Sequence, residues 1–229
     1  IPSESTVTFD GITEISGTST TSFHNITIAG NVTAPTAMNV AGDWAGSAGS
    51  FVHNSGKVTF NGTNAQTVTT GGAWDPATTN NTWKNNWNEI ITANTSTGGV
   101  TFLDGFKTIK LTCTTPASRL FFQYQQNVTN VFEITASGGL NLQGAAGQLI
   151  QLRKYGGSGS NRWEICPSAP GGLWTVSYVD VLDSLNSATN AIFPASSSDS
   201  GNTVNWFVPT LVQVTGLKAL AYSNRVVVS

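Results

Sequence analysis

Acidic, basic and histidine side chains, which carry most enzyme chemistry, are scarce and scattered in this 229-residue chain. The one close acidic pair is Asp180 and Asp183. Polysaccharide-cleaving enzymes need clustered carboxylates on one face. Three positions along a strand put Asp180 and Asp183 on opposite faces unless a turn intervenes. We therefore expect Asp183 to open a turn at residues 184–187 through bonds from its side chain to the backbone.

The two histidines, His24 and His53, lie in a strand-like segment and beside a turn, and neither accompanies a candidate Ser nucleophile. The chain has no Cys-x-x-Cys pair and no glycine-rich loop that follows a strand and opens a helix. These features argue against a hydrolase triad, a structural zinc site and a nucleotide site. We expect no catalytic residue, no metal and no cofactor, so the chain is predicted not to be an enzyme.

Cys113 and Cys166 are the only cysteines. In an oxidising compartment they could form one disulfide, and the alternative is two small buried thiols. The chain also contains six Asn-x-Ser/Thr sequons, which accept sugar only if the source organism glycosylates asparagine. These possible glycosylation sites are Asn25, Asn31, Asn61, Asn80, Asn94 and Asn127.

Tryptophans are the more promising contact residues. Trp44, Trp87, Trp163 and Trp206 fall in strand-like motifs and are expected in the core or at its end. Trp74 and Trp83 fall in a segment rich in Asn and Thr, outside the repeated motifs. Exposed Trp in such a setting is typical of a site that stacks on sugar or contacts protein. The alternative is that this segment folds over one face and buries both side chains.

The composition limits which kinds of fold can position these residues. Thr (32), Gly (24), Ser (23) and Asn (21) together make 44% of the chain, whereas charged residues make 10% against about 25% in ordinary domains. A net charge of −2 leaves no basic surface for nucleic acid, and no apolar run is long enough to insert in a membrane. Helical bundles are disfavoured because these residue types are poor helix formers. The same composition suits an extracellular protein, and we predict a secreted or cell-surface location.

Short polar–apolar alternations rich in β-branched residues predict strands. They occur at residues 6–9, 25–28, 57–60, 100–103, 108–111 and 132–135. The motif at 7–11 returns at 58–62, an offset of 51, and 23–29 returns weakly at 87–93. We interpret 51 residues as two stacked coils of a β-solenoid, with an insertion at about 73–86 in the second copy. Stacking in register penalises repeated charge and favours uncharged Thr and Asn ladders, which explains the composition.

The segments at 7–11, 23–28, 39–44 and 58–62 resemble a repeat of large bacterial secreted and cell-surface proteins, which reads roughly VTFNG, FNNLTI and LNVAGDW. The resemblance extends over about residues 6–207. It implies a right-handed parallel β-helix with an adhesive or structural role and no common catalytic residues. The chain departs from the repeat at 73–86 and in the aromatic stretch 120–124.

We therefore divide the chain into a parallel β-helix domain at 1–207 and a different segment at 208–229. The second segment resembles the opening strands of a fibronectin-like sandwich. It is the start of a truncated domain, a strand that completes a neighbouring subunit, or a cap on the last coil. The residues expected to form an assembly strand are Leu211, Val212, Val214, Val226, Val227 and Val228.

Three functions follow. The leading hypothesis is a non-enzymatic extracellular structural or adhesive solenoid, which self-associates in a filament or contacts neighbouring surface proteins. The second is a carbohydrate-binding module or a polysaccharide-active enzyme, with glycans as partners. The third, an ice-binding solenoid, is disfavoured because no Thr-x-Thr motif recurs at the spacing of the coils.

Overall fold

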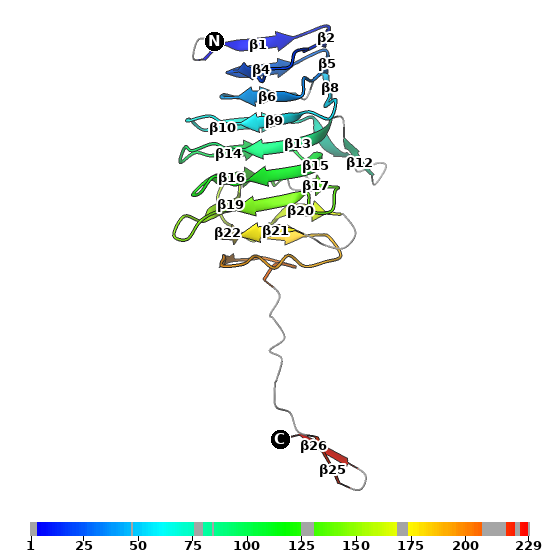
Figure 1. Cartoon of the computed structure of the whole chain (residues 1–229), viewed down its shortest axis with the longest axis vertical. Helices are drawn as coiled ribbons and strands as arrows, with labels where there is room; N and C mark the ends of the chain where they lie inside the picture. The colour runs from blue at the N-terminus through cyan, green and yellow to red at the C-terminus, as the bar shows by residue number, and fades with distance from the viewer. Residues whose placement is uncertain are drawn as a thin grey trace.

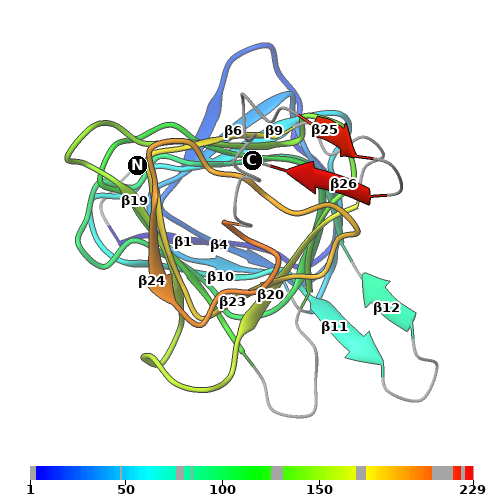
Figure 2. The ribbon, with the colours of Figure 1, turned by 90° about the horizontal axis from the view of Figure 1, so that it is seen from below.

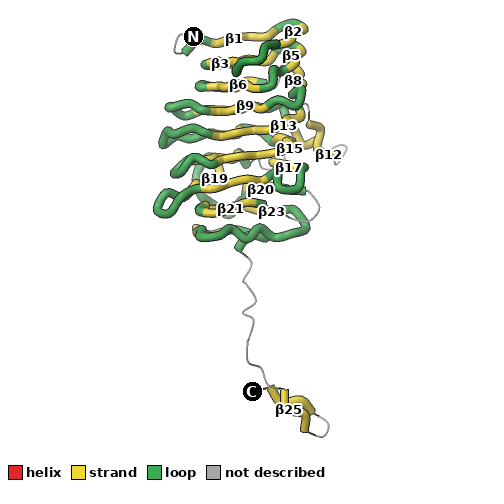
Figure 3. Tube along the Cα trace, in the orientation of Figure 1, coloured by secondary structure: helices red, strands yellow, loops and turns green. Residues whose placement is uncertain are grey.

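The computed structural model describes residues 4–46, 48–75, 80–83, 85–124, 131–168, 174–207, 219–222 and 225–228. In 72–75, 80–83, 219–222 and 225–228 it describes the backbone. Within these ranges the regular elements are all β-strands, as Figure 3 shows. None of the described residues forms a helix that could cross a membrane. The expected all-β chain with parallel sheets is confirmed.

Nine strands form one parallel sheet in the order in which the chain visits them (Figure 1). They are β1 (Thr6–Phe9), β4 (Asn25–Ile28), β7 (Trp44–Ala45), β10 (Gln66–Thr69), β14 (Val100–Phe102), β16 (Arg119–Phe122), β19 (Ile150–Lys154), β22 (Val179–Leu182) and β24 (Ser198–Gly201). Each pairs in parallel with the next. Because the order never reverses, each passage of the chain lies against the preceding one.

Thirteen further strands form a second parallel sheet that branches at two long strands. Its main path is β2 (Ile12–Glu14), β5 (Asn31–Thr33), β8 (Ser50–Val52), β13 (Asn86–Thr92), β15 (Phe106–Cys113), β17 (Val131–Ile134), β20 (Trp163–Pro167) and β23 (Ser184–Asn186). The branches are β3 (Thr21–Phe23), β6 (Ala37–Val40) and β9 (Lys57–Phe60), which reach β13, and β18 (Leu140–Gln143) and β21 (Thr175–Ser177), which start from β15. Strands β13 and β15 therefore run along two faces of the stack.

Two antiparallel hairpins stand apart from this pattern. One joins β11 (Gly72–Asp75) to β12 (Asn80–Trp83), and the other joins β25 (Ala219–Tyr222) to β26 (Arg225–Val228). In the end-on view of Figure 2, β11 and β12 lie outside the ring formed by the parallel strands. The residues expected as an insertion thus include a hairpin that leaves the stack.

The inward side chains of successive layers form a continuous aromatic core. Trp44, Trp87 and Trp163 are 1% exposed and Trp206 is 4% exposed, so their predicted burial is confirmed. The rings of Phe122 and Trp163 stack nearly parallel, with centroids 4.1 Å apart. One layer cannot bury such rings alone, so each layer depends on its neighbours.

The 51-residue repeat does not mark two equivalent coils. Residues 7–9 lie in β1 of the nine-stranded sheet, whereas 58–60 lie in β9 of the branched sheet. The lengths of the layers also vary, because Thr6 pairs with Asn25, 19 positions later, and Val68 pairs with Phe102, 34 positions later. The expectation was wrong because the Val-Thr-Phe motif specifies a half-buried strand without specifying its face.

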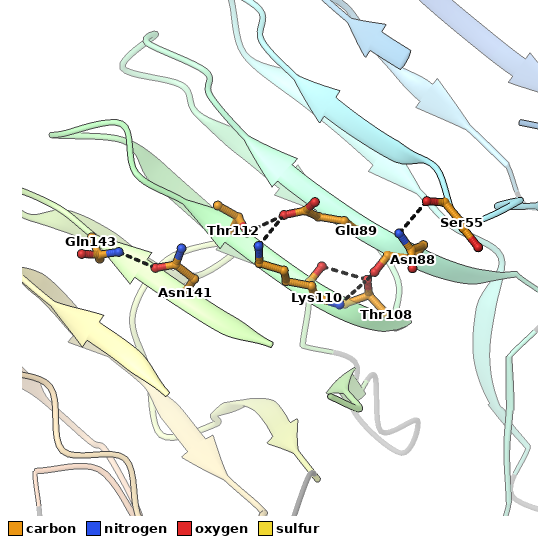
Figure 4. Close-up of polar contacts among 8 residues, drawn as sticks. All are labelled: Ser55, Asn88, Glu89, Thr108, Lys110, Thr112, Asn141 and Gln143. Carbon is orange, nitrogen blue, oxygen red and sulfur yellow. Dashed lines mark hydrogen bonds and ion pairs between the residues drawn. The ribbon is translucent and has the colours of Figure 1, made fainter. Parts of the chain in front are cut away.

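Charged residues on the outer faces meet opposite charges on the next strand. Glu89 of β13 is in register with Lys110 of β15, and a carboxylate oxygen lies 3.0 Å from the ammonium nitrogen (Figure 4). Lys107 and Glu133 are in register in the same way, 3.5 Å apart. Thr112 also donates to Glu89 at 3.0 Å. These contacts fit the expectation that stacking in register tolerates little repeated charge.

Two polar side chains hold the chain where β10 ends and the β11–β12 hairpin begins. The Asp104 carboxylate accepts the backbone N–H groups of Thr70 at 2.6 Å and Gly71 at 2.7 Å. The buried Asn85 amide donates to the Thr70 carbonyl at 2.6 Å and accepts from the Phe51 N–H at 2.7 Å. Desolvation by burial raises the pKa of Asp104 although these hydrogen bonds oppose it. These hydrogen bonds fix the backbone at the point where the hairpin leaves the stack.

Candidate binding site

A cavity of about 520 Å³ lies on the outer face of the nine-stranded sheet. Its floor includes Thr67, Thr101, Phe121 and Arg153, which stand in register on β10, β14, β16 and β19. These side chains point outward because the residues that alternate with them in the strands face the core. The loop at 155–158 borders the cavity.

Phe121 departs from the polar pattern of this outer face. Its neighbours on either side in β16, Leu120 and Phe122, are buried in the core, whereas Phe121 is only partly buried. The ring of Tyr155 adds a second aromatic side chain, which is 45% exposed. Two accessible aromatic rings in one concavity are typical of a binding site for a partly apolar ligand.

Three cations also line the cavity. Arg153 forms an ion pair with Asp180 of the next strand. Arg119 donates to the Thr97 carbonyl at 3.1 Å. In the described part of the chain, no carboxylate oxygen lies within 4.0 Å of the side-chain nitrogens of Arg119 or Lys154. Both charges therefore face the cavity region without an acidic partner.

Asp180 and Asp183 are held by separate sets of polar contacts. Asp180 is bound by Arg153 and accepts from the Ser200 hydroxyl at 2.6 Å. Asp183 is 2% exposed and accepts from the Asn202 amide at 2.7 Å. Its φ of 55° makes the corner between β22 and β23. The expected turn at 184–187 is wrong, since 184–186 are strand β23 and Asp183 bonds to distant residues.

The histidines take structural positions. His24 lies between β3 and β4, and the Nδ1 atom of His53 accepts the Ser55 N–H at 2.9 Å within a turn. Among the described residues, no three His, Cys, Asp or Glu side chains come together as a possible metal site.

Cys113 and Cys166 are free thiols, so the possible disulfide between them is not formed. Cys113 is buried in the core, whereas Cys166 alternates with the buried Ile165 and Pro167 and lies on the outer side of β20. Opposite sides of a sheet cannot be bridged by one S–S bond. Burial raises the pKa of both thiols, which lowers the fraction of reactive thiolate at neutral pH.

Trp74 and Trp83, the contact residues expected from sequence, lie in the β11–β12 hairpin. The backbone register pairs Trp74 with Asn81 and Gly72 with Trp83. The hairpin follows β10, one of the strands beneath the cavity, and the side chains of both tryptophans lie outside what the structure describes. Their contact role stays a prediction.

The sequons differ in accessibility. Asn31 and Asn61 are exposed, and Asn25 is partly buried with its side chain accepting the Asp43 N–H at 2.8 Å. Asn94 is 1% exposed, and its amide nitrogen donates to Asn64 and Gln66. Its side chain is therefore not accessible for glycosylation in the folded chain. For Asn80 the backbone is described, in β12, and Asn127 lies outside the described residues.

The expected assembly strand is described only in part. Val226, Val227 and Val228 belong to β26, which pairs with β25 in an antiparallel hairpin. The other three residues of that expectation lie outside the described residues, namely Leu211, Val212 and Val214. Its role in assembly stays a prediction.

Sequence reasoning missed the cavity. One local signal was present, because Phe121 and Phe122 interrupt the alternation of polar and apolar residues in the stretch that departs from the repeat. The cations gave no signal, since Arg119 and Lys154 are 35 positions apart in the sequence. They come to line one cavity only because β16 pairs with β19.

Comparison with known protein families, with curated proteins and with solved structures finds no match to this chain.

Proposed function

We propose that this chain is a non-enzymatic structural or adhesive module outside the cell, built as a right-handed parallel β-solenoid like those of bacterial surface proteins. In this proposal it displays its outer faces rigidly and associates with further copies through its ends. The observation that carries the proposal is that, among the described residues, the strands of the first layer have no partner on one side.

In the described part of the chain, β1, β2 and β3 each pair with one strand only, the strand of the following layer. The inward side chains Phe9, Ile15 and Phe23 are accordingly only partly buried, although equivalent side chains deeper in the stack are fully covered. Unpaired strand edges beside apolar side chains are a template for another chain.

The direction of the free backbone groups can be worked out from the pairing of β1. The Phe9 carbonyl accepts from Ala29 at 2.8 Å, so Phe9 turns its polar groups toward β4. The backbone N–H and C=O groups of successive residues point to alternate sides of a strand. Those of Thr6 and Thr8 therefore point away from β4, toward the open edge. The occupant we infer is the last layer of a second copy, since β24 ends the same sheet and runs in the same direction as β1.

The test is a proline in the open edge. Thr8→Pro removes a donor that faces outward and breaks no bond to β4, whereas Thr8→Ala keeps the donor. We expect the wild type and Thr8→Ala to associate with rising concentration in analytical ultracentrifugation, and Thr8→Pro to stay monomeric. Equal association of all three proteins, or none by the wild type, contradicts end stacking.

The rival route to assembly is donation of a strand from 211–229. Deletion of these residues separates the two routes when assembly is followed by electron microscopy. Loss of assembly on deletion, with Thr8→Pro unaffected, supports strand donation. Unchanged assembly excludes it.

The second candidate function is carbohydrate binding, and the cavity beside Phe121 and Tyr155 is the observation that favours it. A polysaccharide-active enzyme is the weaker form of this candidate, because the nearby acids Asp180 and Asp183 are held by hydrogen bonds and an ion pair. Release of products from a polysaccharide would be needed to support it.

A further inference from the structure

We propose that the cavity over β10, β14, β16 and β19 binds a carboxylate-bearing saccharide, with Arg119 and Lys154 recognising the carboxylate and Phe121 and Tyr155 packing against the sugar ring. This inference stands apart from end stacking, because the cavity lies on a lateral face and the open edge lies at β1.

The shape of the site suits a short stretch of glycan. Its volume of about 520 Å³ falls within the roughly 300–1,000 Å³ that small-ligand sites occupy. The floor is a sheet rather than a mobile segment, because Thr101, Phe121 and Arg153 belong to three paired strands. A floor held by parallel pairing is ordered before the ligand arrives, which lowers the entropic cost of binding.

The rim is formed by a loop whose backbone needs glycine. Gly156 and Gly157 have φ values of 82° and 94°. A Cβ atom at either position would have no heavy atom within 4 Å, apart from those of the adjacent residues. The loop therefore leaves open space at the mouth of the cavity where most side chains would be strained. A ligand can approach the backbone closely there.

The aromatic side chains favour a sugar over a small inorganic anion. Phe121 offers a partly exposed ring on an outer face where the aligned positions of β10 and β14 carry Thr67 and Thr101. Tyr155 offers a ring with a hydroxyl that can donate or accept. A saccharide has apolar C–H faces for the rings and hydroxyls for the neighbouring threonines and Gln151.

The charge balance favours an acidic saccharide. Three cations, Arg119, Arg153 and Lys154, stand against two carboxylates, Asp180 and Asp183, which leaves one positive charge in a chain whose net charge is −2. Both carboxylates already accept hydrogen bonds, and the ion pair with Asp180 satisfies the charge of Arg153. The Arg119 guanidinium gives one bond to a backbone carbonyl and keeps donors for a ligand carboxylate.

The experiment is isothermal titration of the full chain with oligogalacturonate, with a neutral galactose oligomer of the same length, and with a sulfated oligosaccharide. We expect the carboxylated oligomer to bind and the neutral one to bind at least about ten-fold more weakly, since a lost charged contact costs that much or more. Tighter binding of the sulfated oligomer would assign the site to sulfate and overturn the carboxylate assignment.

Variants locate the binding. Arg119→Gln and Phe121→Thr, the latter copying the residue type at the aligned position of β14, should each weaken binding about ten-fold or more. Lys57→Gln is the matched control, because Lys57 is an exposed cation on the branched sheet with no carboxylate oxygen of the described chain within 4.0 Å. Circular dichroism and thermal melting verify that each variant folds.

Three further results would overturn the proposal. These are no binding of the acidic oligomer up to about 10 mM, equal binding of the neutral oligomer, and equal weakening by Lys57→Gln. Each is distinct from the ultracentrifugation result that decides end stacking, so either proposal can fail alone.

Discussion

Replacement of Gln66 by Leu tests whether polar groups at a buried corner of the stack hold neighbouring layers together. Gln66 is 0% exposed. Its carbonyl oxygen accepts from the Gly62 N–H at 2.8 Å and from the Asn94 amide at 2.9 Å. Its amide nitrogen donates to the carbonyls of Val40 at 2.9 Å and Gly42 at 2.6 Å. The four bonds connect three successive passages of the chain.

The expected loss follows from counting which partners stay bonded. The Val40 carbonyl also accepts from Asn61, and the Asn94 amide also donates to Asn64. Within the described chain, the Gly62 N–H and the Gly42 carbonyl have no second hydrogen-bond partner. Two orphaned backbone groups cost about 1–3 kcal/mol each, so we expect Gln66→Leu to lower the free energy of unfolding by about 2–6 kcal/mol.

The assay is urea unfolding followed by tryptophan fluorescence and by far-ultraviolet circular dichroism, whose agreement checks for a single transition. Gln151→Leu is the control, because Gln151 lies on the outer side of β19 and should change stability by less than about 0.5 kcal/mol. A loss below about 1 kcal/mol for Gln66→Leu, or a loss equal to the control's, would refute the reasoning.

Three further predictions concern single side chains. Trp163→Ala removes the ring stacked on Phe122 and should lower the free energy of unfolding by about 3–5 kcal/mol in the same urea assay. Burial raises the pKa of Asp104, so the folded state binds its proton more readily than the unfolded state. As pH falls from neutral through that raised pKa, the stability of the wild type relative to Asp104→Asn should rise, measured as urea midpoints against pH. A thiol reagent should modify Cys166 in the native protein and Cys113 only after unfolding, as read by mass spectrometry.

The strands could be predicted from the sequence because each is a local pattern. The alternations at 6–9, 25–28 and 57–60 coincide with β1, β4 and β9. The burial of the inward tryptophans was also predictable, because a large apolar ring at an apolar position of an alternating strand is usually buried. The order of strands in space was not predictable from the repeat, because loops of different length place similar strands on different faces.

The candidate site was less accessible to sequence reasoning. Trp74 and Trp83 stand out in the sequence as aromatic residues in a polar segment, whereas Phe121 belongs to an aromatic stretch whose only visible feature is its departure from the repeat. A local pattern shows that a side chain faces outward, but it does not show which outward side chains of distant strands become neighbours.

The sequence by itself determined that this is an all-β chain with an apolar inner face and a charge-poor outer face, because alternation and composition act within each strand. Only the tertiary structure decided which side chains of different strands become neighbours. Parallel pairing of β16 with β19 brings Phe121 beside Arg153, and the sides of the sheet separate Cys113 from Cys166. The physical reason is that register and loop length, which no single strand encodes, fix the contacts between layers.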